Sequence, residues 1–541
     1  METRWDFSEK AGRIFESMFL LMFILSISTI SSSVADADNL LDEMTLNAQD
    51  KASLLLFRSQ VRDPNQRLLW VGSGCANWTG VGCSRWNGRV LALNLTGFNL
   101  SGQLHSSLCN LSSLETLNLS RNNLSGSIPP CFSSFWNLKT LDLSYNMFSG
   151  VVPDTLMKLS RLTHLDFSHN MFDEMLPYWI GNFSLKLQKL EMGYNSFQGE
   201  IPEGLLHLKS LKFLDLSHNN LSGNLPDFRQ SLEHLNLESN SLIVLDLSYN
   251  QLSGYLPKKI LESSEKSGLI VLDLSHNQFS GDIPLGFTEL KSLQALFLSH
   301  NLLTGEIPSR IGNLTYLQVI DLSHNSLSGS IPLNFIGCFQ LLALILNNNN
   351  LSGEIQPELD ALDILKILDV SNNKISGQIP LTLAGCKSLE VVDLSYNNLS
   401  GPLNDALTKW SNLRYLSLAH NKFNGPLASW IFMFEGIQTI DLSGNTFSGN
   451  ILMVFLIPAN LSSLGNLTHL NLSFNYFSGI VNKTKGYWRF SGAFAGNPNL
   501  CVETSGSGDG CQLKARPVEP ERAFEEGEIK KWADFGMGVF G

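Results

Sequence analysis

The sequence predicts an elongated solenoid of stacked short repeats with one parallel β-sheet along its concave face. The phrase L-x-L-x-x-N, or a close variant, returns at 24-residue intervals over most of the 541 residues, as at Asn301, Asn325 and Asn349. Most units extend it to L-D-L-S-x-N-x-L-S-G-x-I-P, as in the run from Ile320 to Pro332. Because one unit cannot bury its own leucines, neighbouring units must stack to form a core.

The first part of each unit predicts a short strand. Leu141 and Leu143 alternate with Asp142 and Ser144, which is the two-residue side-chain period of a β-strand with one buried face. Asn146 follows where the chain turns. Its amide can bond backbone groups of its own turn and of the neighbouring turn, so we expect a buried asparagine ladder along the array.

The start of the chain resembles a secretory signal. The run from Met18 to Ile30 is largely apolar and is followed by the small residues Ser31 to Ala35. It is shorter than the roughly 20 apolar residues that span a membrane. We therefore expect the following organisation: a signal peptide over residues 1–35, an N-terminal cap over 36–88, repeats over 89–490, a C-terminal cap over 491–515 and an acidic tail over 516–541.

Charge and motif content favour a binding protein over an enzyme. With 37 basic and 49 acidic residues the net charge is −12, which argues against nucleic acid as a partner and favours a cationic one. Asp534-Phe535-Gly536 copies the metal-binding tripeptide of kinases, but no glycine-rich loop, lysine strand or catalytic loop precedes it. We expect no catalysis, no cofactor and no metal.

Many N-x-S/T sequences agree with secretion, although the repeat phrase N-L-S generates them automatically. Those at Asn94, Asn118 and Asn471 fall within predicted concave strands, where a glycan would obstruct binding. Sites outside the strands are the better candidates for glycosylation. They are Asn77, Asn110, Asn182, Asn313, Asn398, Asn466 and Asn482.

Four of the eight cysteines flank the repeat array. Cys75 and Cys83 precede the first repeat, and Cys501 and Cys511 follow the last one. The ends of a solenoid expose leucine cores and need caps, which disulfides commonly staple in small secreted elements. We expect the pairs Cys75–Cys83 and Cys501–Cys511.

The other four cysteines lie inside the array. Cys109 and Cys131 belong to adjacent turns, and the sequence leaves open whether they form a bridge. Cys338 and Cys386 are two repeats apart, roughly 10 Å, which is too far for a disulfide. We interpret them as small buried apolar residues.

Two columns of side chains recur on the predicted concave face. An acidic residue stands four positions before most anchor asparagines, and a His or Tyr stands one position before many of them. Consensus composition explains both columns best, although His276, His300 and His324 on consecutive turns raise the alternative of a metal site. The acidic column contains Asp142, Asp166, Glu191, Asp215, Asp246, Asp273, Asp321, Asp369, Asp393 and Asp441.

Exceptions to the acidic column suggest a contact patch. Phe297 and Ile345 replace the acid two turns apart, one on each side of Asp321. Large apolar groups are seldom left in water without use, so we predict a ligand-binding patch of these three residues flanked by His300 and His324. The alternative is a local covering of these side chains by a neighbouring group or a glycan.

Three segments carry a family resemblance. The Trp78-Thr-Gly-Val-Gly-Cys83 cap, the Leu-Ser-Gly-x-Ile-Pro repeat and the Gly496-Asn-Pro-Asn-Leu-Cys501 end resemble plant extracellular leucine-rich-repeat receptors. The segment from Leu290 to Asn301 is more narrowly similar to the kinase-lacking receptor-like proteins of the CLAVATA pathway. The resemblance implies a right-handed solenoid of the α/β class with a concave parallel sheet and disulfide-stapled caps.

The resemblance also implies a function. Such proteins take part in perceiving small secreted peptides of the CLE type, signal through a membrane-bound kinase or kinase-like co-receptor, and restrain stem-cell number in meristems. We therefore expect a non-catalytic receptor subunit of the secretory pathway and plasma membrane. The alternatives are a soluble inhibitor of microbial wall-degrading enzymes, such as polygalacturonase, and a truncated decoy.

The sequence departs from that family at three places. Asn240 and Asn250 are only ten residues apart, which indicates an incomplete repeat, and Asn445 and Asn475 are 30 apart, where the family usually carries an island and further repeats. The segment ending at Gly541 is too short and too polar for the family's membrane helix. As written, the chain is expected to be a secreted ectodomain or a truncated form.

Overall fold

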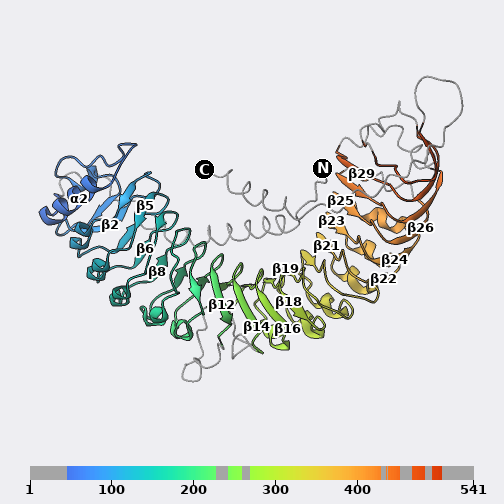
Figure 1. Cartoon of the computed structure of the whole chain (residues 1–541), viewed down its shortest axis with the longest axis horizontal. Coiled ribbons are helices and arrows are strands. Elements are labelled where there is room, and N and C mark those ends of the chain that lie inside the picture. Colours follow the sequence, from blue (N-terminus) through green and yellow to red (C-terminus); the bar gives the residue numbers. More distant parts are fainter. Residues whose placement is uncertain are drawn as a thin grey trace, which may run out of the picture.

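The computed structural model describes residues 45–226, 242–258, 268–427, 434, 436–450, 466–481, 490 and 492–502. These residues form a curved array that runs from the cap around helix α2 (Ala48–Gln60) to strand β31 (Asn499–Val502) (Figure 1). The predicted signal peptide and acidic tail lie outside the described residues.

The concave face is a single sheet, which has 17 strands within the described residues. All neighbouring strands are parallel and in register except β1, which pairs antiparallel with β2. The strands are β1 (Val81–Cys83), β2 (Val90–Asn94), β4 (Thr116–Asn118), β6 (Thr140–Asp142), β8 (His164–Asp166), β9 (Lys189–Glu191), β11 (Phe213–Asp215), β13 (Val244–Asp246), β15 (Val271–Asp273), β17 (Ala295–Phe297), β19 (Val319–Asp321), β20 (Ala343–Ile345), β21 (Ile367–Asp369), β23 (Val391–Asp393), β25 (Tyr415–Ser417), β27 (Thr439–Asp441) and β29 (His469–Asn471).

The segments that follow the anchor asparagines form shorter lateral sheets at one side of the array. Three such sheets, of three, five and six strands, lie within the described part of the chain. The first lateral sheet consists of β3 (Ser101–Gln103), β5 (Asn123–Gly126) and β7 (Met147–Phe148). The second consists of β10 (Gln198–Gly199), β12 (Asn220–Asn224), β14 (Gln251–Tyr255), β16 (Gln278–Asp282) and β18 (Leu302–Thr304). The third consists of β22 (Ser376–Gly377), β24 (Asn398–Gly401), β26 (Lys422–Pro426), β28 (Thr446–Asn450), β30 (Tyr476–Val481) and β31.

Short 3₁₀ helices return the chain along the convex side (Figure 1). Many begin after a proline, whose fixed φ suits the first helical position, as Pro332 precedes η10. They are η1 (Cys75–Asn77), η2 (Ser106–Asn110), η3 (Pro130–Ser134), η4 (Asp154–Lys158), η5 (Tyr178–Asn182), η6 (Glu203–His207), η8 (Leu285–Glu289), η9 (Ser309–Asn313), η10 (Leu333–Gly337), η11 (Pro357–Ala361), η12 (Leu381–Gly385) and η13 (Asp405–Lys409).

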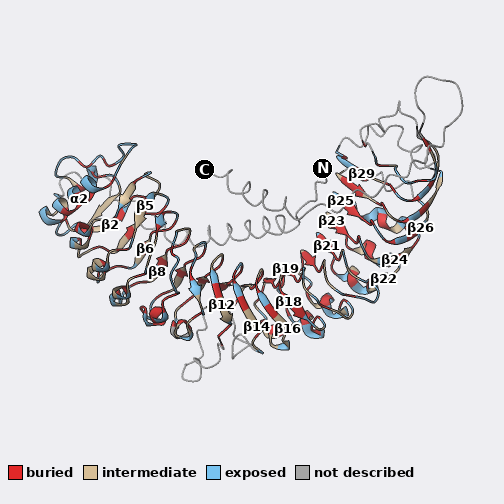
Figure 2. Cartoon of the chain, in the orientation of Figure 1, coloured by how far each residue is buried: buried red, intermediate tan, exposed pale blue. Residues whose placement is uncertain are grey.

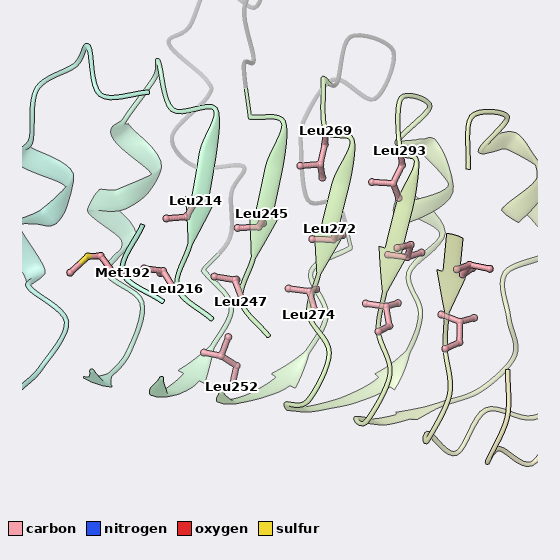
Figure 3. Close-up of a cluster of buried hydrophobic side chains, with 14 of the residues drawn as sticks. Met192, Leu214, Leu216, Leu245, Leu247, Leu252, Leu269, Leu272, Leu274 and Leu293 are labelled. Carbon is pink, nitrogen blue, oxygen red and sulfur yellow. The ribbon is translucent and has the colours of Figure 1, made fainter. Parts of the chain in front are cut away.

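Each turn contributes one layer of leucines to a continuous core. Leu214 and Leu216 of one turn stack on Leu245 and Leu247 of the next, as Figure 3 shows. In strands such as β6 and β11 a buried residue lies between two residues of intermediate burial, whereas all three residues of β17, β19, β20, β21 and β23 are buried; Figure 2 colours the chain by burial. Burying one such leucine stabilises the fold by about 1.5–3 kcal/mol, and only a neighbouring turn can supply that burial.

The predicted asparagine ladder is confirmed. The Nδ2 group of Asn146 donates to the carbonyls of Leu119, Leu143 and Ser144 at 2.9, 3.1 and 3.1 Å. Its Oδ1 accepts from the N–H of Leu124 at 3.0 Å. Every rung therefore ties its own turn to the preceding one, and the buried amide has all its bonds satisfied.

The close spacing of Asn240 and Asn250, from which the sequence predicts an incomplete repeat, does not interrupt the concave sheet. Strand β11 pairs directly with β13, and Asn250 bonds the backbone of Leu216 and Leu221 in the preceding turn. Asn219 and Asn250 are thus neighbouring rungs of the ladder, because both amides donate to the carbonyl of Leu216. Asn240 itself lies outside the described residues.

The 30-residue spacing before Asn475 has the same explanation. Strand β27 pairs directly with β29, and Asn475 donates to Leu442 O at 2.9 Å across that interval. One more rung follows in the C-terminal cap, where Asn497 donates to Leu472 O and accepts from Phe477 N–H. Sequence spacing alone missed this last rung because Asn497 belongs to the Gly-Asn-Pro segment of the cap.

The N-terminal cap contains the predicted disulfide between Cys75 and Cys83. Beside it, Trp70 and Trp78 stack with ring centroids 5.5 Å apart. Buried Asp50 accepts from the guanidinium of Arg89 at 2.6 Å and from the backbone N–H of Val90 at 2.8 Å. The cap thereby joins helix α2 to the first concave strand of the array.

The remaining cysteines are assigned as follows. Cys109 and Cys131 form a disulfide between adjacent turns, which settles the pairing that the sequence left open. Cys338 and Cys386 are buried free thiols, as predicted. Cys501 is disulfide-bonded, but its predicted partner Cys511 lies outside the described residues, so that pairing stays a prediction.

Candidate functional site

Each three-residue strand from β4 to β29 in the concave sheet presents two outward side chains on either side of an inward leucine, isoleucine or valine. In β19 these are Val319 and Asp321, which flank Ile320 of the main core. The register of the parallel sheet aligns the third residues of successive strands, so Phe297, Asp321 and Ile345 are direct neighbours. The structure therefore brings together the three residues of the predicted contact patch.

The exposure that the sequence predicted for Phe297 and Ile345 is wrong. Their exposed fractions are only 9% and 3%, and they belong to a second hydrophobic cluster that is separate from the leucine core. The other outward position belongs to the same cluster and is apolar over seven successive turns. These residues are Val244, Val271, Ala295, Val319, Ala343, Ile367 and Val391.

We call the nine residues of this second cluster the concave strip. It follows the inner face of β13 to β23, where Figure 1 shows no described helix or strand lying across the sheet. Sequence reasoning missed seven of its members because a valine or alanine at the start of a strand fits the repeat pattern. The signal was their recurrence at one position in seven consecutive turns.

The acidic column is hydrogen-bonded rather than bare. In turn after turn the carboxylate accepts from the backbone N–H and the hydroxyl of the serine two residues later, as Asp142 does from Ser144 at 3.0 and 2.7 Å. Asp321 and Asp369 are buried, and the Tyr415 hydroxyl donates to Asp393 at 3.2 Å. Short local bonds of this kind explain why aspartate recurs at the position.

Burial also changes the protonation of the column. It raises the pKa of Asp273 to about 6, and burial together with the neighbouring carboxylate of Asp393 raises the pKa of Asp369 to about 8. Burial and then the charge of Asp166 raise the pKa of Glu191 to about 8. The concave face is therefore less negative in mild acid than a simple count of carboxylates indicates.

The His and Tyr column forms a continuous stack of rings. Ring centroids of successive members lie 3.9 to 4.1 Å apart with nearly parallel planes. Each member has a positive φ near 50°, an unusual conformation for residues other than glycine. The stack contains Tyr145, His169, Tyr194, His218, Tyr249, His276, His300 and His324.

Stacking argues against a metal at His276, His300 and His324. The nitrogen lone pairs of an imidazole lie in the ring plane, and here the planes are nearly parallel and about 4 Å apart, so they do not converge on one ion. Within the described residues no group of three or more His, Cys, Asp or Glu could hold a metal. His324 instead contacts the Asn348 amide at 3.0 Å.

Six of the candidate glycosylation sites lie in the described residues, and all six asparagines are exposed, as the attachment of a glycan requires. They are Asn77, Asn110, Asn182, Asn313, Asn398 and Asn466. Asn482 lies outside the described part of the chain. In the described ranges, no helix is both long and apolar enough to cross a membrane.

Comparison with known proteins identifies the repeat. A crystal structure of a TDR receptor is 34% identical to this chain, covers 77% of it and 68% of its own length, and superposes with a TM-score of 0.67. The chain belongs to the leucine-rich-repeat family. Two leucine-rich-repeat models match, one at residues 112–172 and 363–423, the other at 186–208, 210–230, 241–261, 268–290, 292–314, 316–338 and 466–484.

Further leucine-rich-repeat relatives are plant receptors. A stretch of 99 residues is 50% identical to the receptor-like protein CLAVATA2 of Arabidopsis thaliana; it amounts to 18% of this chain and 12% of that relative. The Arabidopsis receptor kinase HAESA, solved with the peptide hormone IDA and the co-receptor SERK1, is 27% identical over 86% of this chain and all of the solved one, with a TM-score of 0.55.

Proposed function

We propose that the chain is the ligand-binding part of a non-catalytic receptor-like subunit that perceives a small secreted peptide of the CLE type. The likeness to CLAVATA2, itself named a receptor-like protein, and to the solved TDR receptor supports this proposal. The subunit would follow the secretory pathway to the plasma membrane and act through a membrane-bound kinase or kinase-like partner. HAESA, solved with both a peptide hormone and a co-receptor, is the model for that arrangement.

The concave strip is the observation that carries the proposal. It gathers nine apolar side chains along one face, each at most 9% exposed, with acidic residues Asp273, Asp321, Asp369 and Asp393 interleaved. An extended peptide laid across the parallel strands can place apolar side chains on the strip and basic ones beside the carboxylates. Such a ligand suits a chain with a net charge of −12.

Binding of synthetic CLE-type dodecapeptides to the purified chain tests the proposal. The informative variant is Phe297→Asp with Ile345→Asp, because aspartate is what most other turns carry at this position and the fold accommodates it there. Two lost apolar contacts of about 1–2 kcal/mol each lower the affinity by about 30-fold or more. A matched control is Leu302→Asp with Leu333→Asp, which changes exposed leucines on other faces of the turns that hold Phe297 and Asp321.

Two outcomes would sink the proposal. One is a parent protein that binds the dodecapeptides no better than scrambled peptides of the same composition. The other is a folded Phe297→Asp, Ile345→Asp variant that binds like the parent. Tight binding of a fungal polygalacturonase in place of peptides would instead establish the inhibitor function that the sequence left as an alternative.

A further inference from the structure

Two neighbouring turns break the lateral repeat pattern in the same place. Directly after the anchor asparagine most turns carry a polar residue, as at Asn220 and Ser326, but these two turns carry Met147 and Met171. Four residues further along they carry Val151 and Met175. All four side chains are exposed, Met171 by 59% and Met175 by 65%.

The lateral sheet is also interrupted at this point. Glu174 stands where the flanking turns have Gly150 and Gly199, both with a φ near +80°. The first lateral sheet ends at β7 and the second begins at β10, with only isolated bridges from Met171 and Met175 between them. Exposed Asp173 and Glu174 add negative charge among the apolar side chains. We call Met147, Val151, Met171, Met175, Asp173 and Glu174 the lateral patch.

A second surface has the opposite charge. Residues 45–100 contain six basic and two acidic residues, a local net charge of +4 in a chain of net charge −12. Helix α2 exposes Leu55 and Leu56 next to Arg58, and exposed Arg62 follows two residues after the helix. We call these four residues the cap patch.

Arg62 of the cap patch and Met147 of the lateral patch lie at opposite edges of the same three-stranded lateral sheet. The backbone N–H of Arg62 donates to Ser101 O at 2.8 Å, and Ser101 N–H donates back to Arg62 O at 3.0 Å, so the cap pairs with β3 at one edge. Met147 lies on β7 at the other edge. With strands about 4.8 Å apart, Arg62 and Met147 are separated by roughly 15 Å along this sheet.

We propose that, with Asn123 free of glycan, the chain forms a twofold symmetric dimer in which the cap patch of each copy docks on the lateral patch of the other. A twofold axis over the middle strand β5 brings both pairs of patches together at once, and each pair matches leucine with methionine and arginine with aspartate and glutamate. A second copy is the partner whose surface satisfies both contacts simultaneously.

Size favours the closed dimer over a single contact. One patch of four apolar side chains offers only a few hundred Å², whereas a stable interface buries about 800 Å² per partner. Two symmetric contacts and the strand between them approach that area. Asn123, on β5 between the patches, begins an N-x-S sequence, so a glycan there would hold two copies apart.

The experiment is sedimentation of the purified chain carrying Asn123→Gln over about 1 to 100 µM, the weak end of affinities for interfaces of this size. We expect a monomer–dimer equilibrium that stops at twice the monomer mass and weakens when salt rises from about 0.05 to about 0.5 M. A monomer throughout this range overturns the proposal, as does growth beyond the dimer.

Charge reversal then assigns the contact. Asp173→Lys with Glu174→Lys, and separately Arg58→Glu with Arg62→Glu, should each weaken dimerisation at least about tenfold, or about 1.4 kcal/mol. Because each variant complements the other, an equimolar mixture should form the heterodimer. A matched control, Asp282→Lys with Glu306→Lys, reverses exposed lateral acids outside the patch and should dimerise like the parent.

Failure to fold does not obscure the result. Met171→Gln with Met175→Gln leaves every charge in place and should also weaken the dimer. Folding of each variant is checked by circular dichroism. Folded charge variants that dimerise like the parent, or that fail to pair when mixed while the parent dimerises, contradict the assigned contact.

Discussion

Asp369 and Asp393 occupy matching positions on the neighbouring strands β21 and β23, and burial and the charge of Asp393 raise the pKa of Asp369 to about 8. In the unfolded chain the same carboxyl has a pKa of about 3.9. Unfolding therefore releases a proton between about pH 4 and about pH 8, so the contribution of this group to stability is full in acid and is lost as the pH rises.

The first prediction concerns this pair. Asp369→Asn removes the titration but keeps an oxygen to accept from Ser371 N–H. From pH 5 to pH 8 the free energy of unfolding of the parent should fall by on the order of 1 kcal/mol per pH unit. The free energy of unfolding of the variant should fall clearly less over the same interval. Thermal unfolding at the two pH values measures this. Asp363→Asn, an exposed acid of the same turn, should behave like the parent; a variant with the parent's pH dependence would contradict the prediction.

The second prediction concerns the ring stack. His218 lies between Tyr194 and Tyr249 at centroid distances of 3.9 and 4.1 Å, and burial, followed by the charge of His169, lowers the pKa of His218 to about 4. Its folded pKa lies below the unfolded value of about 6.5, so its contribution to stability is present above about pH 6.5 and is lost as the pH falls toward 4.

Tyr194→Asn tests this cause directly. Asparagine adopts positive φ readily, as Asn348 and Asn372 do at the same repeat position, but it leaves one face of the His218 ring open to water. The NMR titration midpoint of His218 should rise toward 6.5 in the variant. An unchanged midpoint would show that the stacked ring is not the source of the lowered pKa.

The third prediction concerns the asparagine ladder. Asn146→Ala leaves the buried N–H of Leu124 without its side-chain acceptor, at about 1–3 kcal/mol, whereas the carbonyl of Leu119 keeps the amide of Asn122 as a donor. Hydrogen exchange at Leu124 should accelerate strongly, with smaller effects several turns away. Asn123→Ala, next to the ladder but exposed, serves as the control; equal exchange in the two variants would refute the role of the rung.

The fourth prediction concerns the disulfide between Cys109 and Cys131. Its two cysteines are 22 residues apart, so the loop-closure model assigns the cross-link about 3 kcal/mol. Cys131→Ser should therefore increase hydrogen exchange in the turns around η2 and η3. Uniform loosening of the whole array would instead indicate that the bridge does not act locally. A peptide map of the parent protein should contain the two cysteines in one linked peptide.

The repeat period was sufficient to predict the strands, the ladder and the neighbourhood of Phe297, Asp321 and Ile345. These depend on local alternation and on the fixed length of a turn. It was insufficient for the burial of Ile345, because the cluster around this residue is built from several turns that each look ordinary alone.

The direct step from Asn219 to Asn250 shows how this architecture tolerates insertion. The ladder and the concave strand set the register of a turn from about ten residues, so the return segment can lengthen without displacing the turns on either side. Surface loops of new composition can therefore arise, or be engineered, at single turns while the inner face keeps its geometry.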